Sequence, residues 1–282
     1  MKNHPDEITS PANPRIRAAA SLRDADARRA TGLTLVDGLR EIGRALSAGI
    51  EFTEAFLDRD ATPDPARAEL LAALAARHVT TTPLARRPFD RVAFGSRNEG
   101  VVAVARFQAR ALDAFRAASD RPVLVVDGVE KPGNLGAILR TCDAAGIAGV
   151  IACGGGTDPA NPAVIRASLG TVFTLPLAVS TTPAAIAWCA RHRRAVVAAT
   201  PAGRLLWHQA RLDGNVAILL GSEAFGISSS WREAATAGTI AWETIRLPMR
   251  GIADSLNVAA TAAILAYEAL RQQTASGRNT TP

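Results

Sequence analysis

Short apolar runs alternate with helical segments over residues 122–271, and this alternation limits the possible folds more than any other feature of the chain. Runs such as 122–127, 195–200 and 216–220 are nearly continuous in apolar residues, without the alternating polar positions of a half-exposed strand. Strands of this kind are typically buried on both faces of a parallel sheet. The sequence therefore predicts an α/β domain with a parallel sheet, closed by a long helix over 256–271.

The N-terminal part differs in composition from the rest of the chain, because it is rich in Arg. Expected strands and helices again alternate there, which indicates a second, smaller α/β unit. The expected strands are 33–36, 52–57, 78–81 and 101–106, and the expected helices are 15–23, 38–48 and 63–77. Residues 108–121 are polar and Arg-rich. We therefore expect a small N-terminal domain over 1–107, a linker over 108–121 and the larger domain over 122–282.

The charge of the chain favours a polyanionic partner. The formal net charge is +6, the pI is near 10.2, and Arg accounts for all but two of the 32 basic residues. The planar fork of the guanidinium group matches phosphate, and a basic surface attracts nucleic acid over a distance. Arg and Ala are also frequent in GC-rich coding sequences, which explains the Arg/Lys ratio equally well but not the net charge.

Several function classes are disfavoured. The chain has no apolar stretch long enough to span a bilayer and begins with a polar segment, so we expect a cytoplasmic protein without membrane partners. Cys142, Cys153 and Cys189 lie in apolar stretches and read as buried, reduced thiols. Cys189 and His192 are two potential ligands at helical spacing, too few for a metal site. No P-loop, dinucleotide-binding Gly motif or GxSxG elbow stands after the expected strands.

Three loops carry the residues that could perform chemistry, and each follows the carboxyl end of a predicted strand, where open α/β sheets bind ligands. They span 127–140, 219–226 and 247–258, and their polar candidates are Asn134, Arg140, Glu223, Ser255 and Asn257. Each residue also has a purely structural interpretation. Asn134 and Ser255 could be helix N-caps, Arg140 a surface charge and Glu223 a helix-start carboxylate.

The combination of the three loops is more specific than any one of them. The sequence contains N-x-G-A-I-x-R, L-x-G-S-E-x-x-G and P-M-x-G followed by S-L-N-V, in this order. Together they resemble the three signature motifs of the SpoU (TrmH) family of SPOUT methyltransferases, which methylate ribose 2′-hydroxyls of tRNA or rRNA. Ile8–Ser10, Asn13-Pro14, 35–41 and 100–104 resemble the small substrate-binding domain of that family. The resemblance covers about residues 8–271.

The resemblance implies a fold, a cofactor and an assembly. It implies a parallel-sheet SPOUT domain with a deep trefoil knot, S-adenosyl-L-methionine as the cofactor, and a homodimer through the C-terminal domains. By position, the cofactor would be bound by Thr200, Gly221, Leu247, Met249 and Leu256. Asn134 and Arg140 would lie at the ribose and phosphate of the target nucleotide, with Glu223, Ser255 and Asn257 completing a polar cluster. No metal is implied.

The expected reaction is methyl transfer to an RNA ribose 2′-hydroxyl, with 23S ribosomal RNA as the expected substrate because tRNA-specific relatives often lack the N-terminal domain. The residues expected to contact RNA are Arg15, Arg17, Arg23, Arg28, Arg29 and Lys131. Some family members confer resistance to ribosome-targeting antibiotics, and the composition would suit a high-GC producer. The alternative is a non-catalytic RNA-binding or ribosome-assembly factor that keeps the fold.

Overall fold

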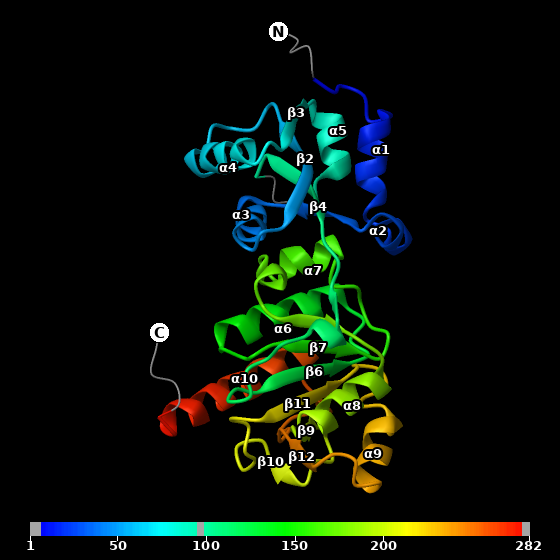
Figure 1. Ribbon diagram of the computed structural model, residues 1–282, viewed down its shortest axis with the longest axis vertical. Coiled ribbons are helices and arrows are strands. Elements are labelled where there is room, and N and C mark those ends of the chain that lie inside the picture. The colour runs from blue at the N-terminus through cyan, green and yellow to red at the C-terminus, as the bar shows by residue number, and fades with distance from the viewer. Residues whose placement is uncertain (1–6, 95–98, 278–282) are drawn as a thin grey trace. The chain divides into compact units, whose positions relative to one another are not determined.

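The computed structural model describes residues 7–94 and 99–277, and the chain forms two compact units. Each unit is assembled from separated segments. The first contains residues up to 108 together with 158–174, and the second contains 109–157 together with the residues from 175 onward. Figure 1 follows the chain through both units by colour.

The first unit is built on a four-stranded sheet with the order β1-β4-β2-β3. β4 is antiparallel to both of its neighbours, and β2 and β3 are parallel. The strands are β1 (Leu33–Asp37), β2 (Glu51–Asp58), β3 (Thr80–Leu84) and β4 (Val101–Arg106). The four strands expected from the sequence are thus present, with β3 beginning two residues later than expected.

Six α-helices in the described part of the first unit accompany this sheet: α1 (Pro14–Ser21), α2 (Ala25–Thr31), α3 (Leu39–Ser47), α4 (Pro65–Ala76), α5 (Arg86–Val92) and α7 (Pro162–Ala167). α1 begins where expected, because the Asn13 side chain accepts a hydrogen bond from Arg15 N and Pro14 is the first helical residue. The short helices α2 and α5 were not expected from the sequence. At seven residues each, they are too short to show a clear helical period.

Residues 158–174 come from the C-terminal part of the sequence but pack in the first unit. The Arg28 guanidinium binds the Asp158 carboxylate at 2.8 Å, and Arg44 donates to the carbonyl of Leu169 at 2.8 Å. Thr34 donates from its hydroxyl to the carbonyl of Ala160. The domain boundaries inferred from composition assigned residues 158–174 to the larger domain. Contacts between segments that are distant in sequence cannot be detected from local composition.

The second unit contains an eight-stranded sheet in which every pairing is parallel, as the apolar runs predicted. Its order is β10-β12-β9-β11-β6-β7-β8-β5. The strands are β5 (Arg110–Ala111), β6 (Val123–Asp127), β7 (Val150–Cys153), β8 (Leu177–Val179), β9 (Ala195–Ala199), β10 (Leu205–Leu206), β11 (Val216–Gly221) and β12 (Trp242–Arg246). Every residue of β6 is buried, which explains its continuous apolar run.

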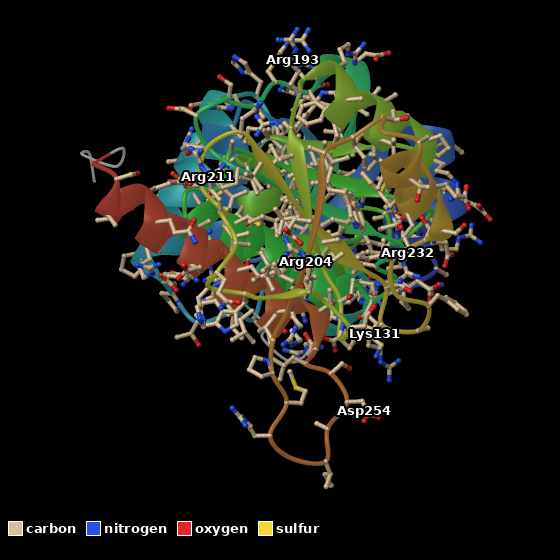
Figure 2. The ribbon with its side chains drawn as sticks, turned by 90° about the horizontal axis from the view of Figure 1, so that it is seen from below. Lys131, Arg193, Arg204, Arg211, Arg232 and Asp254 are labelled. Carbon is tan, nitrogen blue, oxygen red and sulfur yellow. The ribbon has the colours of Figure 1, made fainter. Side chains whose placement is uncertain are left out.

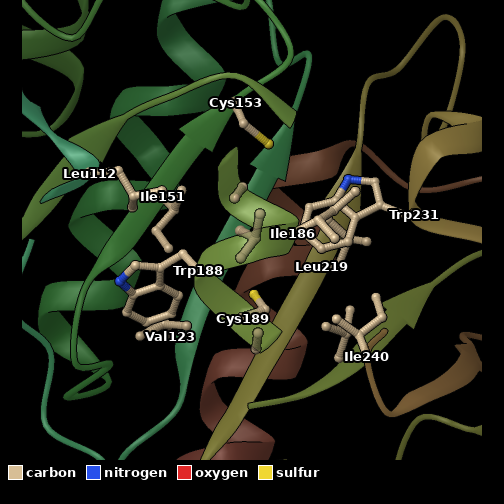
Figure 3. Packing of buried hydrophobic residues seen from close by; sticks show 14 of the residues in the cluster. Leu112, Val123, Ile151, Cys153, Ile186, Trp188, Cys189, Leu219, Trp231 and Ile240 are labelled. Atoms are coloured by element: carbon tan, nitrogen blue, oxygen red, sulfur yellow. The ribbon is translucent and has the colours of Figure 1, made fainter. Parts of the chain in front are cut away.

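Helices cover both faces of this sheet: α6 (Pro132–Ala144), α8 (Thr182–Arg191), α9 (Ser229–Thr236) and α10 (Val258–Ala275). α6 and α10 pack against each other, as do α8 and α9. Trp188 of α8 and Trp231 of α9 join one core cluster with Val123 and Leu219 of the strands (Figure 3). Cys142, Cys153 and Cys189 are buried free thiols, as predicted.

The segment over 108–121 contributes to this core. Leu112 and Phe115 are buried in the cluster, and β5 pairs with β8 at the sheet edge. The polar, Arg-rich character of the segment hides these two apolar residues. Within the part of the chain that the structure describes, no helix is both long enough and apolar enough to cross a membrane.

Candidate functional site

The three motif loops meet at the carboxyl edge of the second unit's sheet. Asn134 donates from Nδ2 to Glu223 Oε1. Asn257 donates from Nδ2 to Asn134 Oδ1 at 3.1 Å. Asn134 is therefore the central member of a hydrogen-bonded chain that joins one side chain from each loop. Three members of the polar cluster that the resemblance implied, Asn134, Glu223 and Asn257, therefore lie together.

Asn134 is positioned by the start of α6. β6 ends at Asp127, Gly128 turns the chain with a φ of 75°, and Pro132 is the first residue of the helix. Lys131 is the N-cap residue, so the interpretation of Asn134 as the N-cap is wrong. Asn134 instead lies in the first helical turn, and both ends of its side-chain amide bind other loops.

Glu223 is held in a tight turn after β11. Ser222 and Gly226 exchange two backbone hydrogen bonds of 3.0 Å, and Phe225 N donates to Ser222 Oγ at 2.9 Å. A side chain at Gly221 would place its Cβ 2.2 Å from the carbonyl carbon of Gly226. The turn therefore requires glycine at Gly221, because the backbone approaches there too closely for any Cβ.

Asn257 is the N-cap of α10, a role that the sequence had assigned to Ser255. Its Oδ1 accepts from Ala259 N at 2.8 Å while its Nδ2 donates to Asn134. The sequence interpretation placed Asn257 inside the first helical turn, where Asn is unfavourable. The structure removes this conflict, since the helix begins at Val258 and Asn is a preferred N-cap.

A cavity of about 510 Å³ opens beside this chain of polar residues. All five residues predicted to bind the cofactor line it, namely Thr200, Gly221, Leu247, Met249 and Leu256. Glu223, Ser255, Asn257 and Lys131 also line it. The cavity thus has apolar walls, a close-packed glycine backbone and polar groups on one side, a combination that suits a small molecule with an apolar ring and a charged centre.

Arg140 lies apart from this cluster. It is exposed on α6 and does not line the cavity, and its side chain makes no hydrogen bond or ion pair with the part of the chain described. Six residues separate it from Asn134, which corresponds to about 9 Å along the helix and about 240° around it. Within a single chain, Arg140 therefore points away from the site that Asn134 enters.

Most of the basic residues predicted to contact RNA already have partners within the first unit. Arg15 binds Glu54 at 2.7 Å, Arg29 pairs with Asp26, and Arg23 donates to the carbonyl of Ala93. Arg17 is exposed, with no ion pair among the described residues. The basic face expected from the sequence is therefore partly neutralised.

Arg28 differs from the other members of this group because it is only 4% exposed. Its guanidinium binds Asp158 and the carbonyls of Leu22 and Arg23. All of these partners lie within the first unit. Arg28 therefore stabilises the unit internally, and we do not include it in an RNA-contacting surface.

Among the lining residues that the sequence interpretation missed are the large or charged side chains of Phe225, Arg232 and Asp254. Phe225 and Asp254 occupy variable positions of the motifs, and Arg232 follows the second motif in the first turn of α9. In Figure 2, the loop that carries Asp254 projects from the ribbon close to Lys131. Motif matching identified the fixed positions of the motifs. The residues on the rim of the cavity could be identified only from the folded conformation of the loops.

The fold and the cavity define an α/β protein that binds a small molecule at the carboxyl ends of parallel strands and surrounds it with three glycine-containing loops. Residues 121–267 match the model of the SpoU rRNA Methylase family, and residues 13–103 match that of the MRM3-like substrate binding domain. The chain belongs to the SpoU rRNA methylase family, as the motifs predicted.

Individual relatives agree over nearly the whole chain. The chain is 32% identical to a 23S rRNA (uridine(2479)-2′-O)-methyltransferase of Streptomyces viridochromogenes, over 93% of this chain and 91% of the relative. A crystal structure of an RNA 2′-O ribose methyltransferase has a TM-score of 0.83 at 38% identity and covers 95% of this chain and 99% of its own. An AdoMet-bound rRNA methyltransferase from Sinorhizobium meliloti has a TM-score of 0.83 at 28% identity, covering 94% and 97%.

Proposed function

We propose that this protein transfers the methyl group of S-adenosyl-L-methionine to the 2′-hydroxyl of a nucleotide in 23S rRNA. The observation that carries the proposal is the hydrogen-bonded chain of Glu223, Asn134 and Asn257 beside a cavity of cofactor size. Relatives named as 23S rRNA 2′-O-methyltransferases, and an AdoMet-bound structure of the same fold, support it.

The cavity residues have distinct tasks in this proposal. Leu247, Met249 and Leu256 form apolar walls for the cofactor, and Thr200 and Gly221 contact it through the backbone. The cofactor supplies a methyl group that its sulfonium charge already activates. Asn134, Glu223, Ser255 and Asn257 orient the ribose hydroxyl towards that methyl, which supplies the alignment that a displacement requires. The ribose oxygen would gain the methyl group as its bond to sulfur breaks, the sulfur would leave as a neutral thioether, and the hydroxyl proton would pass to solvent.

Arg140 binds the phosphate of the target nucleotide and stabilises the developing alkoxide. An arginine side chain is a poor general base, because its guanidinium group stays protonated at neutral pH and cannot accept the hydroxyl proton. Since Arg140 points away from its own chain's cavity, we propose that it serves the cavity of a second protomer. One face of α10, with the exposed Ala260, the half-buried Ile264 and the 52% exposed Tyr267, supports a homodimer through the C-terminal unit. We also propose the deep trefoil knot of the SPOUT fold for this unit.

The first unit supplies RNA affinity in this proposal, through Arg15, Arg17, Arg23 and Arg29. Its match to a substrate-binding domain supports this division of labour. Deletion of residues 1–107 is a poor test, since residues 158–174 would lose the partners that Arg28 and Arg44 provide. The substitution Arg17→Gln is a more specific test of RNA binding by the first unit. It removes an exposed cation without breaking an ion pair between described residues, and it should weaken RNA binding without changing cofactor affinity.

The deciding experiment incubates the protein with unmodified 23S rRNA transcript and methyl-labelled S-adenosyl-L-methionine, and then maps the modified ribose. We expect one methylated 2′-hydroxyl with the wild-type protein and none with Asn134→Ala. RNA binding without methyl transfer would instead favour the non-catalytic ribosome-assembly factor. A mapped ribose inside an antibiotic-binding site, with a raised inhibitory drug concentration in cells that carry the protein, would extend the proposal to resistance.

A further inference from the structure

Phe225 is a large apolar side chain that the fold leaves in solvent. It is 86% exposed, although it belongs to the turn that holds Glu223. Burial of a Phe side chain stabilises a fold, and this chain forgoes that gain. We propose that Phe225 is the platform on which the base of the target nucleotide stacks, so that the enzyme takes an unpaired nucleotide. This inference rests on the proposed function and extends it to the substrate's secondary structure.

The backbone around Phe225 is fixed before any RNA binds. The two backbone hydrogen bonds between Ser222 and Gly226 close the turn, and Ser222 Oγ accepts from the backbone N–H of Phe225. A base that stacks on the ring therefore has to order the Phe225 side chain but not the turn that carries it. Pre-organisation of this kind increases the affinity gained from each contact.

Phe225 lies two residues after Glu223 in the same turn and lines the same cavity as the polar chain. The ribose 2′-hydroxyl must reach the Glu223–Asn134–Asn257 chain, and the base is attached to the neighbouring carbon of the sugar. The base must therefore lie close to the Glu223 turn. Among the described residues that line the cavity, Phe225 is the one aromatic side chain, and stacking on aromatic rings is the usual way in which proteins hold unpaired RNA bases.

Two cations accompany Phe225 on the rim. Lys131 and Arg232 line the same cavity and are exposed, and neither forms an ion pair with a described residue. They are therefore available for the phosphates on either side of the stacked nucleotide. Stacking and phosphate binding differ in their response to salt, because only phosphate binding releases counterions.

This arrangement excludes a paired target. An A-form duplex exposes its 2′-hydroxyls in the shallow minor groove, so an enzyme could reach the hydroxyl without moving the base. A paired base, however, is stacked between its neighbours and presents no free face to Phe225. Methylation that depends on Phe225 therefore requires a loop, a bulge or a strand end.

The test uses the 23S rRNA transcript to map the ribose, and then a stem-loop RNA that carries the mapped nucleotide unpaired. The variants are Phe225→Ala, Phe225→Leu and Phe225→Tyr. Ile252→Ala is the matched control, because Ile252 is fully exposed on the loop after β12 but does not line the cavity. Loss of one stacked base corresponds to about a 5- to 150-fold fall in kcat/KM for RNA.

We expect this fall for the Ala and Leu variants, near-normal turnover for the Tyr variant and for Ile252→Ala, and unchanged S-adenosyl-L-methionine affinity throughout. Phe225→Ala should leave the salt dependence of RNA binding unchanged, whereas Arg232→Gln should reduce its slope by about one. Pairing the target with a complementary oligonucleotide should abolish methylation.

Three results would overturn the role of Phe225 while leaving the proposed function intact. They are normal turnover by the Leu variant, loss of cofactor affinity or of dimerisation in the Ala variant, and equal methylation of the paired and unpaired targets. If the wild-type protein transferred no methyl group to 23S rRNA, the proposed function itself would fail, and this inference with it.

Discussion

Asn257 donates a 3.1 Å hydrogen bond to Asn134, which lies 123 positions earlier in the chain. The same Asn257 side chain caps α10 through Ala259 N. One residue therefore determines where the closing helix begins and also orients the central amide of the candidate site. The two tasks use opposite ends of its side chain, so they can be separated by substitution.

Asn257→Asp should retain the cap and lose the site. Aspartate still accepts from Ala259 N, so we expect near-normal thermal stability. It cannot donate to Asn134, so we expect the rate of methyl transfer to fall by about 10-fold or more, as is typical when one hydrogen-bond donor of an active site is lost. Asn257→Ala loses both interactions and should also lower the free energy of unfolding by about 1 kcal/mol. Denaturant titration and a methyl-transfer assay on both variants check this separation. Equal activity of Asn257→Asp and wild type would show that the hydrogen bond from Asn257 to Asn134 is unimportant for methyl transfer.

The strands and the three motif loops could be predicted because their signals are local. The apolar run over 123–126 in β6 reflects the burial of that strand, and the glycines around Glu223 reflect the close backbone approach in that turn. The helix caps could not be predicted with the same certainty, since Asn134, Ser255 and Asn257 are all good N-cap residues by type. Which of them caps a helix depends on where the backbone turns, and that is decided by contacts between distant loops.

The arginines of the N-terminal segment show where prediction from sequence fails. Composition alone cannot distinguish a cation that faces solvent from one that is paired. Arg28 is paired with Asp158, which lies 130 positions later, and the sequence contains no local sign of this bond. The exchange of residues 158–174 into the first unit was unpredictable for the same reason.

If the proposed homodimer forms, Arg140 should act in the site of the partner protomer. We expect Asn134→Ala and Arg140→Ala homodimers to be inactive, because each lacks one group in both sites. A heterodimer of the two variants would contain one complete site if Arg140 serves its partner, and should recover about half of the wild-type rate. Differently tagged chains, co-expressed and purified through both tags, provide the sample. An inactive heterodimer would place Arg140 and Asn134 in the same chain's site.

Arg140→Lys tests how the guanidinium acts. Lysine keeps the charge but loses the planar pair of donors that binds phosphate. We expect a rise in KM for RNA and a fall in kcat of about 10-fold or more, with S-adenosyl-L-methionine affinity unchanged. Near-normal turnover would show that charge alone suffices and that bidentate positioning is wrong. Arg193→Lys, which changes an exposed arginine outside the cavity, is the control.

The three cysteines should be unreactive in the folded protein. Burial raises the pKa of the Cys142, Cys153 and Cys189 thiols far above the usual range, and for Cys153 the nearby Asp127 carboxylate raises it further. Because the thiolate is the reactive form, a thiol-specific reagent at pH 8 should label none of them before unfolding and all of them in denaturant. Rapid labelling of one cysteine in the native state would reveal local opening around that residue.

Asp37 should make the first unit more stable as the pH falls through about 6. Desolvation by burial raises the pKa of this carboxyl to about 6, although the Phe94 N–H and the Arg166 guanidinium oppose the shift, and Glu99 and Glu41 add to it. Above pH 6 the carboxyl is ionised in both states, and only the folded state bears the cost of a buried charge. Between about 6 and 3.8 the folded protein binds a proton that the unfolded chain does not, so folding gains free energy as the pH falls.

The full difference amounts to about 3 kcal/mol, since each pKa unit corresponds to about 1.4 kcal/mol. Asp37→Asn removes the titration, so the difference in unfolding free energy between wild type and variant should shift in favour of wild type as the pH is lowered from 8 to 5. As a control, Asp64→Asn at the exposed N-cap of α4 should not change how the unfolding free energy depends on pH over this range. Denaturant titrations at each pH measure the difference. A constant difference between wild type and Asp37→Asn would mean that the Arg166 guanidinium, 3.1 Å away, fully compensates the buried charge.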